Sequence, residues 1–255
     1  MICMNVLQIK TRICTPPKDD LFALMKESLD HIKEKSIIAI TSKVVSIWRG
    51  RCVPKDAYPS KDDLIKYEAD KYLPRDAVPN RWTMHTIKHH LLMPAAGIDE
   101  SNANGFYVLL PKNPKEDAKE ICQRLKVQYR VREMGVLITD SRTLPLRRGV
   151  TGVALGYFGF SPLNDYRGKE DLFGEQLLLT QTNVADALAA CAVLVMGEGS
   201  ESTPIAVIDD VSFVVFGESQ APSDKPFASL EVEESEDLYY PFLSSVQWEK
   251  GGGGT

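Results

Sequence analysis

The chain has 255 residues, 44% of them apolar and 25% charged, with a formal net charge of −5, which excludes a collagen-like protein and the basic surface of a dedicated nucleic-acid binder. Its longest apolar run, residues 187–196, is half of the roughly 20 residues that a membrane span needs, so we expect no membrane contact. Five scattered cysteines without Cys-x-x-Cys spacing, and no signal-peptide pattern, indicate a cytoplasmic protein with reduced thiols.

The first part of the chain predicts two helices with a strand between them. Apolar residues recur at helical spacing over residues 19–35, and Ile37-Ile38-Ala39-Ile40 predicts a buried strand. A second helix is expected over residues 62–73, because Pro74 would end it there. Residues 74–81 then predict a loop, and residues 82–93 an extended segment.

The second part mixes strands and helices. Asn113-Pro114 predicts a helix start, and glycines at 152, 156 and 159 predict close backbone approach along one strand. Strands are expected at 135–139, 150–160, 205–208 and 211–216, and an apolar helix at 183–196. This mixture favours an α+β fold of mixed sheets and packed helices. We expect one catalytic unit over residues 1–250, with room for two intertwined subdomains, and a flexible glycine-rich tail at 251–255.

Three apolar segments run into polar clusters that carry carboxylates and hydroxyls. The clusters are Gly97-Ile98-Asp99-Glu100-Ser101-Asn102, Thr139-Asp140-Ser141, and Met196-Gly197-Glu198-Gly199-Ser200-Glu201-Ser202-Thr203. Mg²⁺ prefers such oxygen ligands, usually completed by substrate phosphates, so the residue types in these clusters fit a cation site. The same residue types are common in turns and helix caps, and spacing alone leaves that alternative open. No P-loop sequence is present.

A small basic cluster comes after the second of these segments. It consists of Arg142, Arg147 and Arg148. Guanidinium groups match carboxylates and phosphates, so the cluster predicts recognition of an anionic group on a substrate. Composition does not distinguish a carboxylate from a phosphate here.

Together these motifs resemble the coenzyme F420:L-glutamate ligase family, also called gamma-glutamyl ligases. The resemblance covers roughly residues 5–215, with the motifs in the family's order and spacing. They are Ala96-Gly97-Ile98-Asp99-Glu100-Ser101-Asn102, Gly135-Val136-Leu137-Ile138-Thr139-Asp140-Ser141, Arg147-Arg148-Gly149-Val150-Thr151-Gly152, Asn164-Asp165-Tyr166-Arg167-Gly168-Lys169-Glu170-Asp171-Leu172-Phe173-Gly174 and Leu194-Val195-Met196-Gly197-Glu198-Gly199. Ser141, Thr143-Leu144-Pro145-Leu146 and Val211 to Phe216 look closer to the folate-metabolism branch than to the deazaflavin branch.

The resemblance implies a homodimer with the gamma-glutamyl ligase-like fold that uses GTP and Mg²⁺ or Mn²⁺. GTP would phosphorylate a carboxylate of a folate-like acceptor, and the amine of L-glutamate would attack the acyl phosphate. Ligation onto the deazaflavin precursor of coenzyme F420 is one alternative, and a non-catalytic nucleotide- and metal-binding module is another. The resemblance implies catalytic roles for Asp99, Asp140, Arg147 and Arg148, and metal ligation by Asp99, Asp140, Ser141 and Glu198. It implies nucleotide contacts from Ser42, Lys43, Asn102, Met196, Gly197, Glu198, Gly199, Ser200, Glu201, Ser202 and Thr203.

One position departs from the family pattern. The sequence Ser46-Ile47-Trp48-Arg49-Gly50 places Ile47 where the family commonly has a lysine that contacts the nucleotide. Lys43 and Arg49 are the candidates to supply the missing charge. Without a substitute, the identity and affinity of the nucleotide are open.

Overall fold

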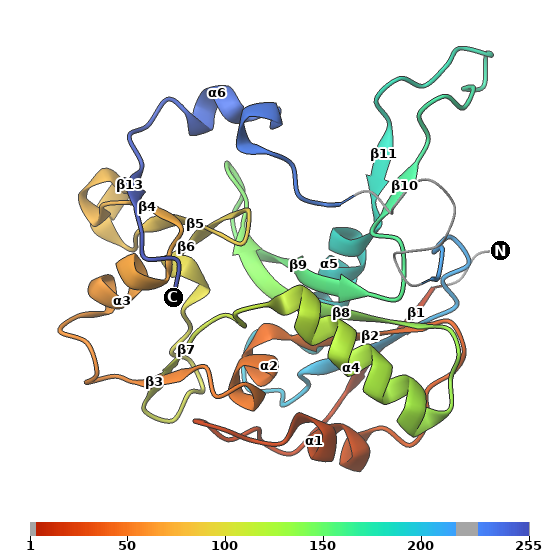
Figure 1. Ribbon diagram of the computed structural model, residues 1–255, viewed down its shortest axis with the longest axis horizontal. Helices are drawn as coiled ribbons and strands as arrows, with labels where there is room; N and C mark the ends of the chain where they lie inside the picture. The colour runs from red at the N-terminus through yellow and green to blue at the C-terminus, as the bar shows by residue number, and fades with distance from the viewer. Residues whose placement is uncertain (1–3, 218–228, 255) are drawn as a thin grey trace.

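The computed structural model describes residues 4–217 and 229–254. At its centre lies a five-stranded sheet of order β1-β12-β2-β8-β9, visible across the middle of Figure 1. Its strands are β1 (Asn5–Ile9), β12 (Ile205–Asp209), β2 (Ser36–Thr41), β8 (Met134–Thr143) and β9 (Val150–Phe158). β2 and β8 pair in parallel and the other neighbours pair antiparallel. The expected mixed α+β class is confirmed.

Helices pack on both faces of this sheet. One face carries α1 (Leu21–Ser28), α2 (Ser42–Trp48) and α4 (Pro114–Tyr129), and the other carries α5 (Val184–Met196). Alternate residues of a strand point to opposite faces, so Ile38 and Ile40 of β2 join the first core while Ile37 and Ala39 join the second. β2 is apolar on both faces, as expected for a strand buried in the centre of a sheet.

A second, smaller sheet lies beside the central one (Figure 1). Its order is β13-β4-β5-β6. Its strands are β13 (Glu249–Lys250), β4 (Lys71–Leu73), β5 (His85–Lys88) and β6 (Leu91–Pro94), and α3 (Lys61–Glu68) shares its core. Two 3-10 turns, Arg75–Ala77 and Pro79–Arg81, lie where a loop was predicted. β13 joins this sheet from the C-terminal part of the chain, so residues far apart in sequence complete it.

The remaining elements are short. β3 (Cys52–Pro54) pairs with β7 (Phe106–Val108), and β10 (Leu163–Asp165) pairs with β11 (Gln181–Asn183). Ala95–Gly97 and Glu234–Glu236 form 3-10 turns, and α6 is Tyr240–Leu243. The connection between β10 and β11 stands out from the body as a long arm in Figure 1.

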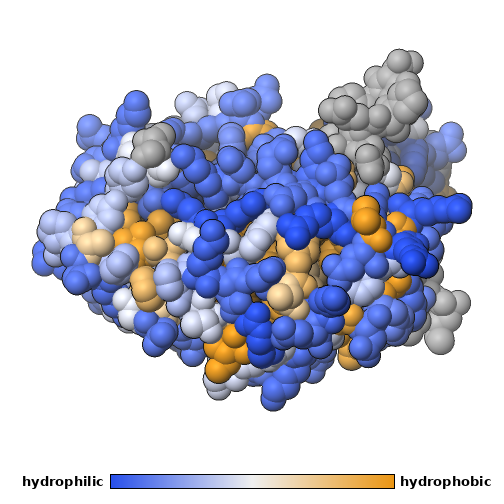
Figure 2. All heavy atoms as spheres, turned by 60° about the horizontal axis from the view of Figure 1, so that its bottom comes forward, coloured by the Kyte–Doolittle hydropathy of each residue, from blue (hydrophilic) through white to orange (hydrophobic). Residues whose placement is uncertain are grey.

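The surface in Figure 2 is mostly hydrophilic, and its apolar side chains gather in small separate patches. Within the two described ranges, the helices are all too short or too polar to cross a bilayer.

Four predicted elements differ from the structure. The first helix ends at Ser28, because Leu29 takes an extended backbone conformation. The second ends at Glu68, and its expected last residues instead form β4, paired with β5. Residues 211–216 form no strand: Asp210 adopts a φ of 60°, residues 211–214 form a turn, and Phe216 makes an isolated bridge to Phe160. β8 extends through Asp140 and Ser141 to Thr143.

Two glycines of β9 act as predicted. A Cβ atom on Gly152 would collide with the backbone of Ala189 in α5, and one on Gly156 would collide with the backbone of Pro114 in α4. Both helices therefore rest directly on β9, one on each face. The close approach is made within this chain, so these glycines give no support to a contact with another subunit.

The glycine-rich tail is packed where it was expected to be flexible. Backbone N–H groups of residues 251–254 donate hydrogen bonds to carbonyl groups of residues 66–70, at the end of α3. Cβ atoms on Gly251 or Gly252 would collide with the carbonyl oxygens of Ala69 and Tyr67, so only glycine fits this groove. The expectation of a free tail is corrected for Gly251–Gly254, and Thr255 lies outside the described residues.

Candidate active site

A cleft of about 690 Å³ opens at the ends of β2 and β8. Thr41, the last residue of β2, lies opposite Thr139 of β8. Because the two strands are parallel, the residues at their carboxyl ends meet at one edge of the sheet. Ser42 and Lys43 begin α2 there, and Asp140 continues β8 beside them. The fold thus explains why polar clusters after separate apolar segments share one cleft.

Most of the predicted site residues line this cleft. They are Ser42, Lys43, Asp99, Asn102, Asp140, Ser141 and the whole of the loop Met196 to Thr203. Arg147 and Arg148 do not line it and are exposed in the turn between β8 and β9. Residues 11–16 form a further wall that the sequence analysis missed. They belong to no motif, and the neighbouring Pro16-Pro17 was the only local signal of a special loop.

Asp99 and Asp140 are separated by 41 positions in the chain and lie close enough to interact electrostatically. Burial raises the pKa of Asp140 to about 7; the Ser141 backbone N–H opposes this rise, and the Asp99 carboxylate adds to it. Burial also disfavours charge on Asp99, but its ion pair with Lys43, with 2.7 Å between Nζ and Oδ2, and hydrogen bonds from Ser101 outweigh it. The pKa of Asp99 therefore lies below its ordinary value.

The oxygen donors of the cleft suit a hard cation. Ser141 Oγ donates a hydrogen bond of 2.6 Å to Glu198 Oε1, which brings that carboxylate to the end of β8. Among the residues that the structure describes, no three His, Cys, Asp or Glu side chains gather into a closed metal cage. Mg²⁺ is commonly held by one or two carboxylates together with water and substrate phosphates. The residues present thus fit a cation that is shared with a phosphate.

The loop after α5 is shaped by its own side chains. The Glu201 carboxylate accepts a hydrogen bond of 2.8 Å from the Gly199 N–H, and Thr203 Oγ1 donates one of 2.5 Å to the Met196 carbonyl. From the opposite wall, Asn102 Nδ2 donates one of 3.0 Å to the Gly199 carbonyl. Asn102 itself adopts a φ of 50°, a strained conformation of the kind that concentrates at functional sites.

Lys43 is the candidate to replace the missing family lysine. Ile47 is only 2% exposed and packs against Ala103 and Val108. Arg49 does not replace it, because its guanidinium contacts Asp117 at 2.7 Å and Glu120 at 2.5 Å and lies over the Trp48 ring. Lys43 and Arg12 are the two basic residues among those described along the cleft.

Comparison with known proteins identifies the family. A family model described as F420-0:gamma-glutamyl ligase matches residues 8–210. The chain belongs to this family. The prediction of a gamma-glutamyl ligase enzyme is confirmed, and the non-catalytic module is set aside.

Several relatives are named coenzyme F420:L-glutamate ligases. The protein of Methanothermobacter thermautotrophicus is 42% identical over 205 residues, which cover 74% of this chain and 80% of the relative. That of Methanopyrus kandleri is 34% identical over 208 residues, covering 75% and 81%. That of Methanocaldococcus jannaschii is 32% identical over 190 residues, covering 69% and 76%.

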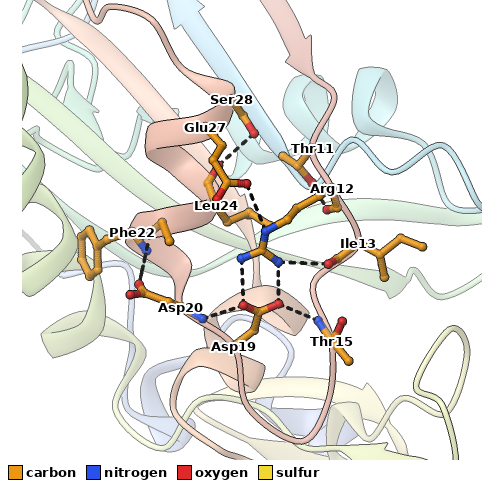
Figure 3. Close-up of polar contacts among 11 residues, drawn as sticks. Thr11, Arg12, Ile13, Thr15, Asp19, Asp20, Phe22, Leu24, Glu27 and Ser28 are labelled. Carbon is orange, nitrogen blue, oxygen red and sulfur yellow. Dashed lines mark hydrogen bonds and ion pairs between the residues drawn. The ribbon is translucent and has the colours of Figure 1, made fainter.

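Residues 11–16, the cleft wall that the sequence analysis missed, are held in place by hydrogen bonds of Arg12, shown in Figure 3. Arg12 donates two hydrogen bonds to the Asp19 carboxylate, at 2.7 and 2.9 Å, and one to Glu27 at 3.1 Å. Asp19 also accepts the Thr15 N–H at 2.9 Å. Arg12 is thus held by two carboxylates outside the proposed cation site, whereas Lys43 pairs with Asp99, which belongs to it, so Lys43 is the better candidate for a phosphate contact.

We expect Asp19→Asn to lower the free energy of unfolding by about 1 kcal/mol at pH 7, since it removes a charge-assisted bidentate pair that is partly exposed to solvent. The hydrogen bonds from Arg12 lower the pKa of Asp19 to about 2, against an ordinary 3.8. The wild-type advantage is thus complete above about pH 4 and disappears as the pH falls towards 2. Urea unfolding at pH 7, 5, 4 and 3 would measure it.

Glu27→Gln is the matched comparison, because it removes only the single, more exposed contact to Arg12. Its effect at pH 7 should be smaller than that of Asp19→Asn. Equal stability of Asp19→Asn and wild type at pH 7 would contradict the role assigned to the hydrogen bonds of Arg12.

Proposed function

We propose that this ligase joins L-glutamate to a carboxylate of the deazaflavin precursor of coenzyme F420, with GTP as phosphoryl donor and Mg²⁺ or Mn²⁺ as cofactor. The observation that carries the proposal is the convergence of Asp99, Asp140 and Glu198 beside a glycine-rich loop in one cleft. The names of the relatives favour the deazaflavin acceptor. No contact in the cleft favours the folate-like acceptor expected from residues 141–146 and 211–216.

The reaction has two steps. A carboxylate oxygen of the acceptor attacks the γ-phosphorus of GTP, the bond to the bridging oxygen breaks, and GDP and an acyl phosphate form. The amine of L-glutamate then attacks the acyl carbon, inorganic phosphate leaves, and the amine nitrogen loses a proton as the amide forms. Catalysis of such transfers depends mainly on positioning and on neutralising the phosphoryl oxygens.

The described side chains match these needs. Asp99, Asp140, Ser141 and Glu198 would hold the cation, which neutralises phosphate charge when bound. Backbone N–H groups of the loop at Gly197 and beyond offer donors for the phosphates. Because Lys43 pairs with Asp99, its ammonium group already lies beside the same place.

The deciding experiment offers labelled L-glutamate, GTP and Mn²⁺ to the purified protein with one acceptor at a time. The deazaflavin precursor, tetrahydrofolate and dihydropteroate are tested in parallel, with and without a chelator. We expect metal-dependent label on the deazaflavin alone. Label on a folate alone would overturn the acceptor but retain the ligase, and absence of both label and GTP hydrolysis with every acceptor would overturn the proposed reaction.

We propose further that the ligase is a homodimer. The arm between β10 and β11 exposes large apolar side chains, and Figure 1 shows it standing clear of the body. They are Leu172, Phe173, Leu178 and Leu179, each at least 75% exposed. Light scattering coupled to size exclusion should give twice the monomer mass, and Phe173→Ser should shift the equilibrium towards monomer. A monomeric wild type at micromolar concentration would refute the dimer.

A further inference from the structure

We infer that Arg142 binds an anionic group of the acceptor other than the reacting carboxylate, and that this group is the phosphodiester of the deazaflavin precursor. The inference rests on the proposed function and adds a specificity-determining residue to it. Three features of Arg142 support it: an unpaired buried nitrogen, its place on the strand face that carries Asp140, and the absence of Asp and Glu from residues 141–164.

The Nε atom of Arg142 has no hydrogen-bond partner in the part of the chain that the structure describes. This atom is shielded from solvent. The arginines at 12, 49, 51, 75 and 167 all hydrogen bond to carboxylates. A buried N–H donor of a charged group that has no acceptor lowers the stability of the folded protein. Such a donor in a native protein is often explained by a ligand or by a catalytic role.

Arg142 lies in β8 two residues beyond Asp140, just outside the lining of the cleft. Ser141 turns towards Glu198 and the loop after α5, so Asp140 and Arg142 share the other face of β8. Two residues along a strand advance about 6 to 7 Å, which separates Arg142 from the proposed cation site by roughly one small anionic group. The reacting carboxylate must lie at the cation, so the anion that meets Arg142 is a second one on the same acceptor.

Beyond Asp140 the hairpin carries only basic charges. From residue 141 to residue 164 the charged side chains are Arg142, Arg147 and Arg148, with no Asp or Glu between them. None of the three makes an ion pair within the described ranges, although Arg147 and Arg148 are exposed and Arg142 is half-buried. An uncompensated cluster of this kind attracts an anion, and planar guanidinium groups bind phosphate through paired hydrogen bonds. Arg142, the half-buried arginine of the three, is the one whose surroundings can restrict which anion binds.

The test measures binding of the deazaflavin precursor by its own fluorescence, without GTP or glutamate, so it is independent of turnover. We expect Arg142→Gln to weaken binding about tenfold or more. Arg142→Lys should restore only part of the affinity, because lysine keeps the positive charge but cannot form the paired hydrogen bonds of a guanidinium group. Arg132→Gln is the matched control, since Arg132 is an exposed arginine that precedes Met134, at the opposite end of β8 from Asp140 and Arg142. Its affinity should equal that of wild type.

A second ligand identifies the group that is recognised. An analogue with a neutral linker in place of the phosphodiester should bind wild type weakly, and Arg142→Gln should weaken it no further. Equal losses for both ligands, or no loss for either, would overturn the inference. So would a KM for L-glutamate that rises while the acceptor KM stays fixed, because Arg142 would then serve the amino acid. Failure of the wild type to ligate glutamate, with binding still dependent on Arg142, would overturn only the proposed reaction.

Discussion

Replacement of Asp140 by Asn should abolish metal-dependent ligation while leaving the protein folded. Asp140 lies in β8 next to Ser141 and interacts electrostatically with Asp99, so its carboxylate is an oxygen donor of the proposed cation site. An amide keeps the shape but loses the charge that holds a divalent cation. We expect glutamate incorporation to fall by about a thousandfold or more, as when preorganised electrostatic stabilisation is removed from other active sites.

Stability distinguishes this loss from misfolding. Burial disfavours charge on Asp140 and raises its pKa, so a neutral amide at this position relieves a cost. The melting temperature of Asp140→Asn without metal should therefore equal or exceed that of wild type. Asp56→Asn, which changes an exposed carboxylate that does not line the cleft, should retain full activity. Undiminished Mn²⁺-dependent turnover in Asp140→Asn would contradict the metal assignment.

Replacement of Lys43 by Met should weaken binding of GTP by about ten- to a hundredfold, since a charge-assisted contact with phosphate is lost. The effect is expected to be large because Ile47 supplies no charge and Arg12 is held by Asp19. Calorimetric titration with GTP and Mn²⁺ measures the change directly. Lys43→Arg should bind more tightly than Lys43→Met, because it retains the positive charge.

Arg49→Met is the matched control for Lys43→Met. It removes a basic residue of the same helix region, but Arg49 is held by Asp117 and Glu120, away from the cleft. We expect lower thermal stability with unchanged affinity for GTP. If Arg49→Met weakened GTP binding and Lys43→Met did not, the replacement for the family lysine would have been assigned to the wrong side chain.

The elements that sequence reasoning found correctly are those whose pattern is local. β2 and the first part of β8 are unbroken apolar runs, and α5 is an apolar helix capped by Asn183. The same reasoning placed polar clusters after these elements, which was sufficient to find most of the cleft. Local patterns also gave one wrong strand: residues 211–216 are mostly apolar, yet Asp210 adopts a positive φ and a turn follows it.

Features that depend on distant partners were not predictable. Residues 11–16 line the cleft because Arg12 folds back to Asp19, and nothing in their sequence marks them as a wall. The glycines at 251–254 have the composition of a loose tail, and only the groove along α3 makes them ordered. Arg147 and Arg148 lie outside the cleft because β8 runs three residues past Asp140 before the turn.

The seating of α4 and α5 on Gly156 and Gly152 has a dynamic consequence. At Gly152 and Gly156 backbone lies directly against backbone, one contact on each face of β9, so at these two positions no side chain separates the strand from its helix. The turn at residues 144–149 is exposed and has no such support. The hairpin is therefore held at its base and free at its tip. We expect slow amide hydrogen exchange at the base and fast exchange at the tip. We therefore expect sequence changes in the tip to leave the backbone around Asp140 in place.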